Sequence, residues 1–320
     1  MIEFLQQAAN YLVLIFVLTS MLNVGLTQKP TNILKHLKNK QFLITMLITN
    51  LIVVPALMVF AVQLFPLAWY YEAGLILFGL AAGAPFLIHL TKTSQRDLAL
   101  GATVMMVLIL GSVVTMPLIV PRILDGVTVN PWQIVATMLI QLILPMIIGM
   151  ILTQVAEPFA AMIQPAVARI SNIVIYLLLA AVLIGYWEAL LDPEIWIAIV
   201  VGLAVILLSF FIGYLIVDGP DELKDVGALG TAQRGTIAAM IVGANAFDDP
   251  RVIVFLTLLN NVGIFVLSFA AKWLSKDARF RIFTPVAADP PQRHPAARSG
   301  ATSSGKSLGG DGVNGPSSSE

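Results

Sequence analysis

Two glycine-broken apolar segments, one in each half of the chain, limit most strongly how this sequence can fold. The first is GLAAGAP at residues 79–85, and the second is GALGTAQRG at residues 227–235, which places Arg234 in the middle of a membrane-length apolar stretch. A transmembrane helix tolerates such a break mainly where the freed backbone groups face protein or a polar cavity. Two breaks in corresponding positions are typical of the substrate site of a transporter.

Composition supports a membrane protein with several spans. Of the 320 residues, 58% are hydrophobic and 11% are charged, whereas an average soluble domain has about 25% charged residues. Net charge is zero, so nucleic acid is not an expected partner. The chain has no cysteine, and its three histidines lack metal-site spacing, so we expect no catalytic residues and no metalloenzyme.

Windows of about twenty residues predict an all-α polytopic protein with nine spans. The predicted spans are 10–27, 41–64, 73–92, 97–120, 132–153, 168–187, 195–217, 226–247 and 251–274. Residues 1–280 are therefore expected to form the transmembrane domain, and residues 281–320, rich in Pro, Gly and Ser, a disordered cytoplasmic tail.

Basic residues predict the orientation, because Lys and Arg stay on the cytoplasmic side. With the N-terminus outside and the C-terminus inside, the outside connections contain Arg122 and Arg251. The inside connections contain Lys29, Lys35, Lys38, Lys40, Lys92, Arg96, Arg169, Lys224, Lys272, Lys276, Arg279 and Arg281. The two broken spans then run in opposite directions, which is inverted-repeat spacing. We expect a multi-pass protein of the plasma or inner membrane.

Several stretches resemble the bile acid:sodium symporter family. The resemblance rests on LTSMLNVGLTQKPTNILKHLKNKQFLITMLITNLIVVPAL, on GLILFGLAAGAP, which is similar to that family's first crossing helix, and on ALGTAQRGTIAAMIVGANAF, which is similar to its second. The resemblance implies a core domain with two crossing broken helices and a panel domain that rocks against it. It also implies transport of an organic anion, commonly with sodium.

The chain departs from the family pattern where the family binds sodium. Leu87 and Ile88 match the positions of a Ser-Asn pair, and Leu229 and Arg234 stand where the family pattern has Glu and Asn. Gln233 alone keeps the family residue. We therefore expect weak sodium coupling, with Thr231 and Gln233 as the remaining ligand candidates, and no other cofactor.

Arg234 is the central residue of the predicted site. A guanidinium suits bidentate contact with an anion, and a charge at membrane depth should face the protein interior or a wet cavity. The alternative is a structural arginine bonded to carbonyls freed by the break. The predicted substrate site comprises Gly83, Ala84, Pro85, Gly230, Thr231, Ala232, Gln233, Arg234, Asn260 and Asn261.

These observations predict a secondary transporter of a small organic anion that works by alternating access. A receptor or scaffold on the same fold is the first alternative, and a flux assay would separate the two. A membrane-embedded enzyme is a second, although the sequence has no HExxH or G-x-S-x-G motif and no paired intramembrane carboxylates.

Overall fold

The computed structural model describes residues 2–29, 31, 35–124, 130–185, 187–247 and 249–275. Within these ranges the chain is helical, without a named strand. Six helices of the described residues are long and apolar enough to cross a membrane, and each of the nine predicted spans falls on one, two or three consecutive helical elements. The predicted tail at residues 281–320 lies outside the described residues.

The first half begins with α1 (Ile2–Thr27). The next span is continuous and consists of α3 (Lys40–Ile48), a π-helical turn η1 (Thr49–Val53) and α4 (Val54–Leu64). The first broken span is α5 (Trp69–Leu80) followed by α6 (Phe86–Thr93), and the uninterrupted α7 (Leu98–Ile123) follows it.

A second π-helical turn interrupts the fifth span, which consists of α8 (Pro131–Met138), η2 (Leu139–Ile143) and α9 (Leu144–Val155). After α10 (Glu157–Gly185) and a short 3₁₀ turn η3 (Trp187–Leu191) comes α11 (Pro193–Ile216). The second broken span is α12 (Asp221–Ala232) with α13 (Thr236–Ala246), and α14 (Arg251–Trp273) is the last described helix.

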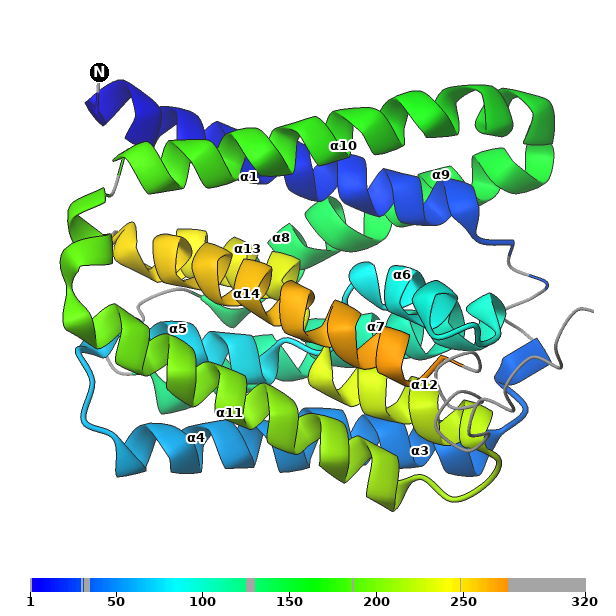
Figure 1. Cartoon of the computed structure of the whole chain (residues 1–320). Helices are drawn as coiled ribbons and strands as arrows, with labels where there is room; N and C mark the ends of the chain where they lie inside the picture. The colour runs from blue at the N-terminus through cyan, green and yellow to red at the C-terminus, as the bar shows by residue number, and fades with distance from the viewer. Residues whose placement is uncertain are drawn as a thin grey trace, which may run out of the picture. The chain divides into compact units, whose positions relative to one another are not determined.

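The helices form two packing groups. One, the panel group, consists of α1, the span α8–η2–α9 and α10; α1 packs along both α9 and α10, and α8 also contacts α7 and α13. The other, the core group, contains α3 to α7 and α11 to α14, with α11 against α12 and α5 against α4 and α14. In Figure 1, α1, α9 and α10 run together along the upper edge of the view. This grouping agrees with the predicted core and panel domains.

Small residues let α1 and α9 approach backbone to backbone. A Cβ added to Gly25 would lie 2.1 Å from the Met146 carbonyl oxygen, and one added to Gly149 would lie 2.6 Å from that of Leu22. The Thr153 hydroxyl bonds to carbonyls on both helices, including Gly149 at 2.9 Å and Leu26 at 3.2 Å. Such close contact is typical of helix pairs in membranes, where small residues replace the hydrophobic driving force.

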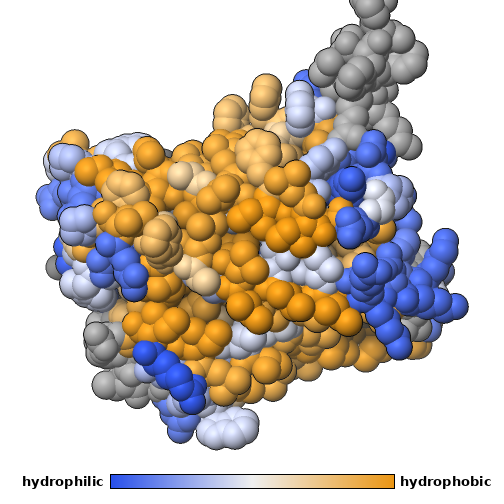
Figure 2. Space-filling model, turned by 90° about the horizontal axis from the view of Figure 1, so that it is seen from below, coloured by the Kyte–Doolittle hydropathy of each residue, from blue (hydrophilic) through white to orange (hydrophobic). Residues whose placement is uncertain are grey.

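The outer surface of the bundle suits a bilayer. Figure 2 shows a broad apolar band on one face, with polar residues gathered at its two ends. Large apolar side chains such as Phe60, Val200 and Phe211 are more than half exposed on this protein. The chain is therefore an integral, multi-pass membrane protein.

Two sequence predictions need correction. The prediction of a span at 168–187 was wrong at its start, because α10 begins at Glu157 and contains Pro165 and Arg169 within the helix. Arg169 thus lies inside a helix instead of in a connection. The second break is also shorter than predicted: Gly227 and Gly230 are helical, and the non-helical residues are 233–235. Gly227 instead permits close packing, since a Cβ added to it would lie 2.7 Å from the Val217 side chain and 3.2 Å from the Gly213 carbonyl oxygen of α11.

Candidate functional site

The two breaks meet and hydrogen-bond to each other. Ala82 and Arg234 form an antiparallel bridge, and the Gly235 N–H donates to the Ala81 carbonyl at 2.8 Å. Ser112 of α7 satisfies the remaining backbone groups of Ala82: its hydroxyl accepts from the Ala82 N–H at 2.7 Å and donates to the Ala82 carbonyl at 2.9 Å. These backbone N–H and C=O groups, which the breaks leave without helical partners, are therefore hydrogen-bonded inside the protein. Such pairing is required because the hydrocarbon layer offers no water to replace it.

Glycine is required on both sides of this crossing. Gly83 has a φ of +80°, a backbone conformation that residues with a Cβ rarely adopt. A Cβ added to Gly235 would lie 2.6 Å from the Gly83 carbonyl oxygen. The contact between the two broken spans is thus as close as backbone atoms allow.

Arg234 is buried at the crossing and bonds to the opposite broken span. Its side chain is among the largest fully buried in the protein, with a relative exposure of 2% for the residue. Its Nε donates to the Phe78 carbonyl at 3.4 Å, and Nη2 donates to the Gly79 carbonyl at the end of α5. The carbonyls come from the first break and not from the arginine's own helix.

Asn50 completes the set of acceptors around the guanidinium. Nη1 of Arg234 donates to Asn50 Oδ1 at 2.8 Å, and Nη2 donates to the Asn50 carbonyl at 3.2 Å. Asn50 lies in the π-helical turn η1 with no exposed surface, and its amide donates to the Met46 carbonyl at 2.9 Å and the Thr231 hydroxyl at 3.3 Å. Sequence reasoning missed Asn50, although an amide near the middle of the apolar span 41–64 was a usable signal.

The positive charge of Arg234 has no acidic partner among the described residues. All of its acceptors are neutral oxygens. The buried ion pair of the core lies elsewhere, between Arg96, which follows α6, and Asp225 of α12, at 2.6 Å. A buried cation without a counter-charge is a strong local attraction for an anion, because the interior screens charge poorly. The N-termini of α6 and α13, which begin at the two breaks, add the same sign of potential.

Gln233 offers the clearest free polar group at the crossing. The residue is 4% exposed, and its side-chain amide has no hydrogen-bond partner within the part of the chain that the structure describes. The amide is not completely enclosed, since the fully buried side-chain atom without a partner among the described residues is Ser209 Oγ. Gln233 is therefore the side chain most available to a ligand.

The other predicted site residues divide into three positions. Ala84 is buried and Pro85 half-buried beside the first break. Gly230, Thr231 and Ala232 are buried in the last turn of α12, where a Cβ on Gly230 would contact Met46 and Val104 at 3.1 Å. On α14, Asn260 Oδ1 accepts from the Thr236 hydroxyl at 2.7 Å, whereas Asn261 donates to the Thr257 carbonyl of its own helix at 2.7 Å.

A cavity of about 380 Å³ separates the panel group from the core group. Its polar wall is formed by Gln141 of η2, Asn245 of α13 and Asp249. Its apolar wall contains Val13, Leu14, Ile241, Ala244, Phe247, Pro250 and Ile253. Arg234 does not line this cavity. The Gln141 amide has no hydrogen-bond partner among the described residues, and that of Asn245 donates to the Ile241 carbonyl at 2.6 Å, so its oxygen remains available.

An ion pair lies at the end of this cavity. Arg251 Nε donates to both carboxylate oxygens of Asp249 at 3.0 Å, and its guanidinium carbon lies 3.8 Å from the ring centre of Tyr70. Burial of Asp249 acts to raise its pKa, but the hydrogen bonds from Arg251 outweigh burial and hold the pKa below its usual value. Asp249 is thus charged at neutral pH and compensated by Arg251.

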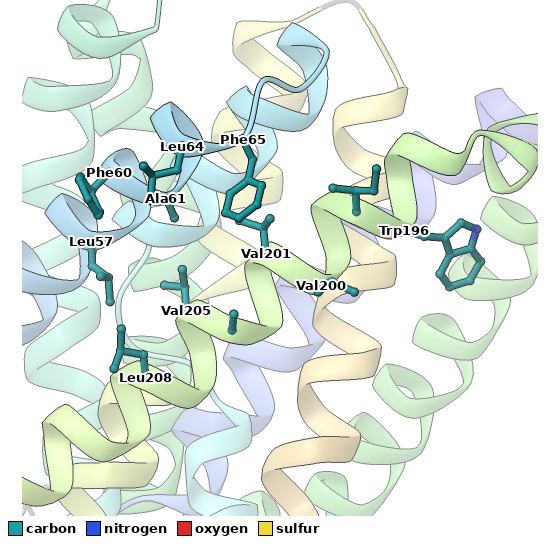
Figure 3. Close-up of a pocket in the computed structure, with 12 residues that line it drawn as sticks. Leu57, Phe60, Ala61, Leu64, Phe65, Trp196, Val200, Val201, Val205 and Leu208 are labelled. Carbon is teal, nitrogen blue, oxygen red and sulfur yellow. The ribbon is translucent and has the colours of Figure 1, made fainter.

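A second, apolar groove has a different character. It has a volume of about 530 Å³ and lies between α4 and α11. Figure 3 shows lining side chains in the space between the two helices, among them Leu57, Phe65 and Val205. Because its lining is apolar, this groove cannot hold the charged group of an anion, and the crossing remains the better candidate site.

The chain has nine apolar ranges on helices, two breaks joined at a buried cation, and a polar cavity between two helix groups. Together these features define a membrane transporter with crossing broken helices. The model of the Sodium Bile acid symporter family matches residues 12–193. The chain belongs to this family and is a membrane transporter of the bile acid symporter type. The match includes the first broken span, whereas α12 and α13 lie beyond it. No curated protein matched the chain closely enough to count as a relative.

Proposed function

We propose that this protein is a secondary transporter that carries a small organic anion by alternating access, with weak or no coupling to sodium. The observation that carries this proposal is the uncompensated positive charge of Arg234 at the crossing of the two broken spans. In this proposal Arg234 attracts the anion through its charge, and the free amide of Gln233 supplies direct hydrogen bonds.

The cavity beside Gln141 and Asn245 supports alternating access. It lies between the panel group and the core group, where relative movement of the two groups would change its volume and its access to water. Its mixed lining of amides and apolar side chains suits an amphipathic organic molecule better than a bare inorganic ion. The substrate enters there, and its charged end approaches the crossing as the groups move.

The same charge argues against a sodium ion at the crossing. Leu87 and Leu229 are buried apolar residues and provide no side-chain oxygen. A cation beside Arg234 would meet a like charge in a poorly screened interior. The guanidinium, held by four oxygen acceptors, instead acts as a fixed cation that joins η1 to both broken spans.

Uptake into proteoliposomes tests the proposal. A thermal-shift screen of organic anions first selects the compound that most stabilises the purified protein, because a ligand that binds the folded state raises its stability. Uptake of that compound should saturate and should be similar in sodium and choline buffers. A receptor or scaffold would bind the compound without moving it, which would contradict the proposal.

Cross-linking tests the movement itself, and the absence of native cysteine makes the experiment clean. Gln141→Cys and Asn245→Cys place thiols on the two sides of the cavity, one in each helix group. A bifunctional maleimide should stop uptake in this double variant. The matched pair Asn245→Cys and Ile253→Cys lies entirely in the core group and should remain active after the same treatment. Equal inhibition of both pairs would exclude rocking between the groups.

A further inference from the structure

The polar cavity between the two helix groups ends beside a guanidinium that the proposed mechanism does not use. Asp249 and Pro250 line this cavity, and Arg251, the first residue of α14, bonds back to the Asp249 carboxylate. Nε of Arg251 donates to both Asp249 oxygens at 3.0 Å, and Nη2 donates to Oδ2 at 2.6 Å. The Arg251 side chain is thus one hydrogen bond away from the cavity wall, and it is 45% exposed.

One edge of this guanidinium remains available to a ligand. A guanidinium carries five N–H donors in a plane, and the bonds to Asp249 use the edge that contains Nε and Nη2. Nη1 has no acceptor in the ranges that the structure describes. The edge between Nη1 and Nη2 has the geometry that binds the two oxygens of a carboxylate.

Two contacts fix the orientation of that edge. The guanidinium carbon lies 3.8 Å from the centre of the Tyr70 ring, within the range of a cation–π contact. Asp249 also accepts from the Arg251 backbone N–H at 2.9 Å, so one carboxylate holds both the side chain and the start of α14. Because the guanidinium is already ordered, a ligand that binds it loses less free energy to ordering.

Aromatic rings connect this cation to the apolar wall of the cavity. Phe247 lines the cavity, and its ring centre lies 5.9 Å from that of Trp69. The Trp69 ring lies 5.7 Å from that of Tyr70, which carries the guanidinium. A fixed cation beside aromatic and apolar walls suits a carboxylate with an apolar or aromatic body better than a bare inorganic anion.

We propose that Arg251 is an outer binding position for the carboxylate of an organic anion, which binds there before it reaches the crossing. The carboxylate accepts from Nη1 and Nη2, Asp249 orients the guanidinium, and the apolar body contacts Phe247. The inference rests on the proposed function for the kind of molecule that enters the cavity, and it narrows that kind to carboxylates. The negative charge of Asp249 offsets that of Arg251, so the anion is held weakly enough to leave for the crossing.

Equilibrium binding of 2-naphthoate and of its neutral amide, 2-naphthamide, to the detergent-purified protein tests this position. The two probes share the same rings, so only the acid should depend on Arg251. We expect Arg251→Ala to weaken 2-naphthoate binding by roughly threefold to tenfold and to leave 2-naphthamide binding unchanged. Arg251→Lys should recover little, because an ammonium lacks the planar fork. Asp249→Asn should bind 2-naphthoate more tightly, since asparagine keeps an acceptor and a helix cap but removes the opposing charge.

Arg122→Ala is the matched control. Arg122 is the other basic residue of the predicted outside connections and is also exposed, so its removal should leave the binding of both probes unchanged. An equal loss of 2-naphthoate binding in Arg122→Ala and Arg251→Ala would show a general attraction by positive charge and would overturn the assignment.

Four other results would contradict it or limit it. Unchanged 2-naphthoate binding in both Arg251→Ala and Asp249→Asn would remove this position, as would the absence of binding to the wild type and to Asp249→Asn. Competition by phosphatidylglycerol that Arg251→Ala abolishes would assign the guanidinium to a lipid headgroup. Binding that depends on the charge at the crossing but not on Arg251 would overturn this inference alone. Dependence on Arg251 without uptake would overturn the transport proposal and leave the binding position in place.

Discussion

Nη1 of Arg234 donates a 2.8 Å hydrogen bond to the side-chain oxygen of Asn50. This bond connects the second broken span to the π-helical turn η1, which lies in the span that precedes the first broken span. The same guanidinium bonds to the carbonyls of Phe78 and Gly79. One side chain thus holds three membrane segments together and contributes a buried positive charge. The predictions below separate these two roles.

Removing Asn50 should destabilise the protein. Asn50→Ala deletes one of the four acceptors of the buried guanidinium, and loss of a hydrogen bond to a charged group costs about 1.5 to 3 kcal/mol. We expect a clear fall in the melting temperature of the detergent-purified protein. Asn260→Ala provides the comparison, since its oxygen accepts from a neutral hydroxyl at 2.7 Å and its loss should cost about 1 kcal/mol. A smaller fall in melting temperature for Asn50→Ala than for Asn260→Ala would contradict the role of Asn50 in holding the Arg234 side chain.

Gly235→Ala should separate the two breaks. The new Cβ would lie 2.6 Å from a backbone oxygen of Gly83, which cannot move as a side chain can. We expect destabilisation by about 1 to 3 kcal/mol, the usual range for overpacking, together with loss of uptake. Gly243→Ala in the same helix is the control, because its nearest contact is the end of the Ile253 side chain at 3.2 Å. Equal melting temperatures for the two variants would show that the crossing is not tight.

Gly25→Ala should disrupt the panel group. The added methyl would overlap the Met146 carbonyl oxygen at 2.1 Å and force α1 away from α9. Gly263→Ala on α14 should be tolerated, since among the described residues the new Cβ would meet the flexible end of the Ile206 side chain at 3.1 Å and no backbone atom. Thermal unfolding of the two purified variants measures the difference. A wild-type melting temperature for Gly25→Ala would mean that the two helices are not in close contact.

The Asp249–Arg251 pair should make a small, pH-dependent contribution to stability. The folded-state pKa of Asp249 lies below its unfolded value of 3.8, so the contribution is present above that pH and is lost as pH falls through the folded-state pKa. Asp249→Asn should therefore lower the melting temperature at pH 7 relative to wild type, and the difference should shrink as the pH approaches 3. A difference that stays constant over this range would contradict an ionised Asp249 in the folded state.

Sequence patterns predicted the spans and the place of the crossing, because long apolar runs and glycine breaks leave few alternatives in a bilayer. They failed at the start of α10, where Glu157, Gln164 and Pro165 lower the hydropathy of residues that are nonetheless helical. Packing along α1 stabilises that helix. The hydropathy of the α10 residues alone does not reveal this contact. The glycines of α12 were misread for the same reason, since Gly227 serves contact with α11.

The side chains that bond to the two breaks were beyond sequence reasoning. Ser112 and Asn50 are polar residues in apolar spans, and their role depends on which helices lie beside the breaks. A hydrogen-bonding side chain in an apolar span is a visible signal, but the group that it contacts is set by the tertiary fold.

Adding a carboxylate beside Arg234 tests the central claim most directly. Asn50→Asp keeps oxygen acceptors for the guanidinium but cancels its charge, so the protein should fold and yet bind the selected organic anion at least about tenfold more weakly. Asn130→Asp adds the same charge at the N-cap of α8, where aspartate also caps well, and should leave affinity unchanged. The measurement is the affinity of both folded variants for the same anion, compared with that of the wild type. Wild-type affinity in folded Asn50→Asp would show that the charge of Arg234 does not attract the substrate, and would restrict this arginine to holding the crossing together.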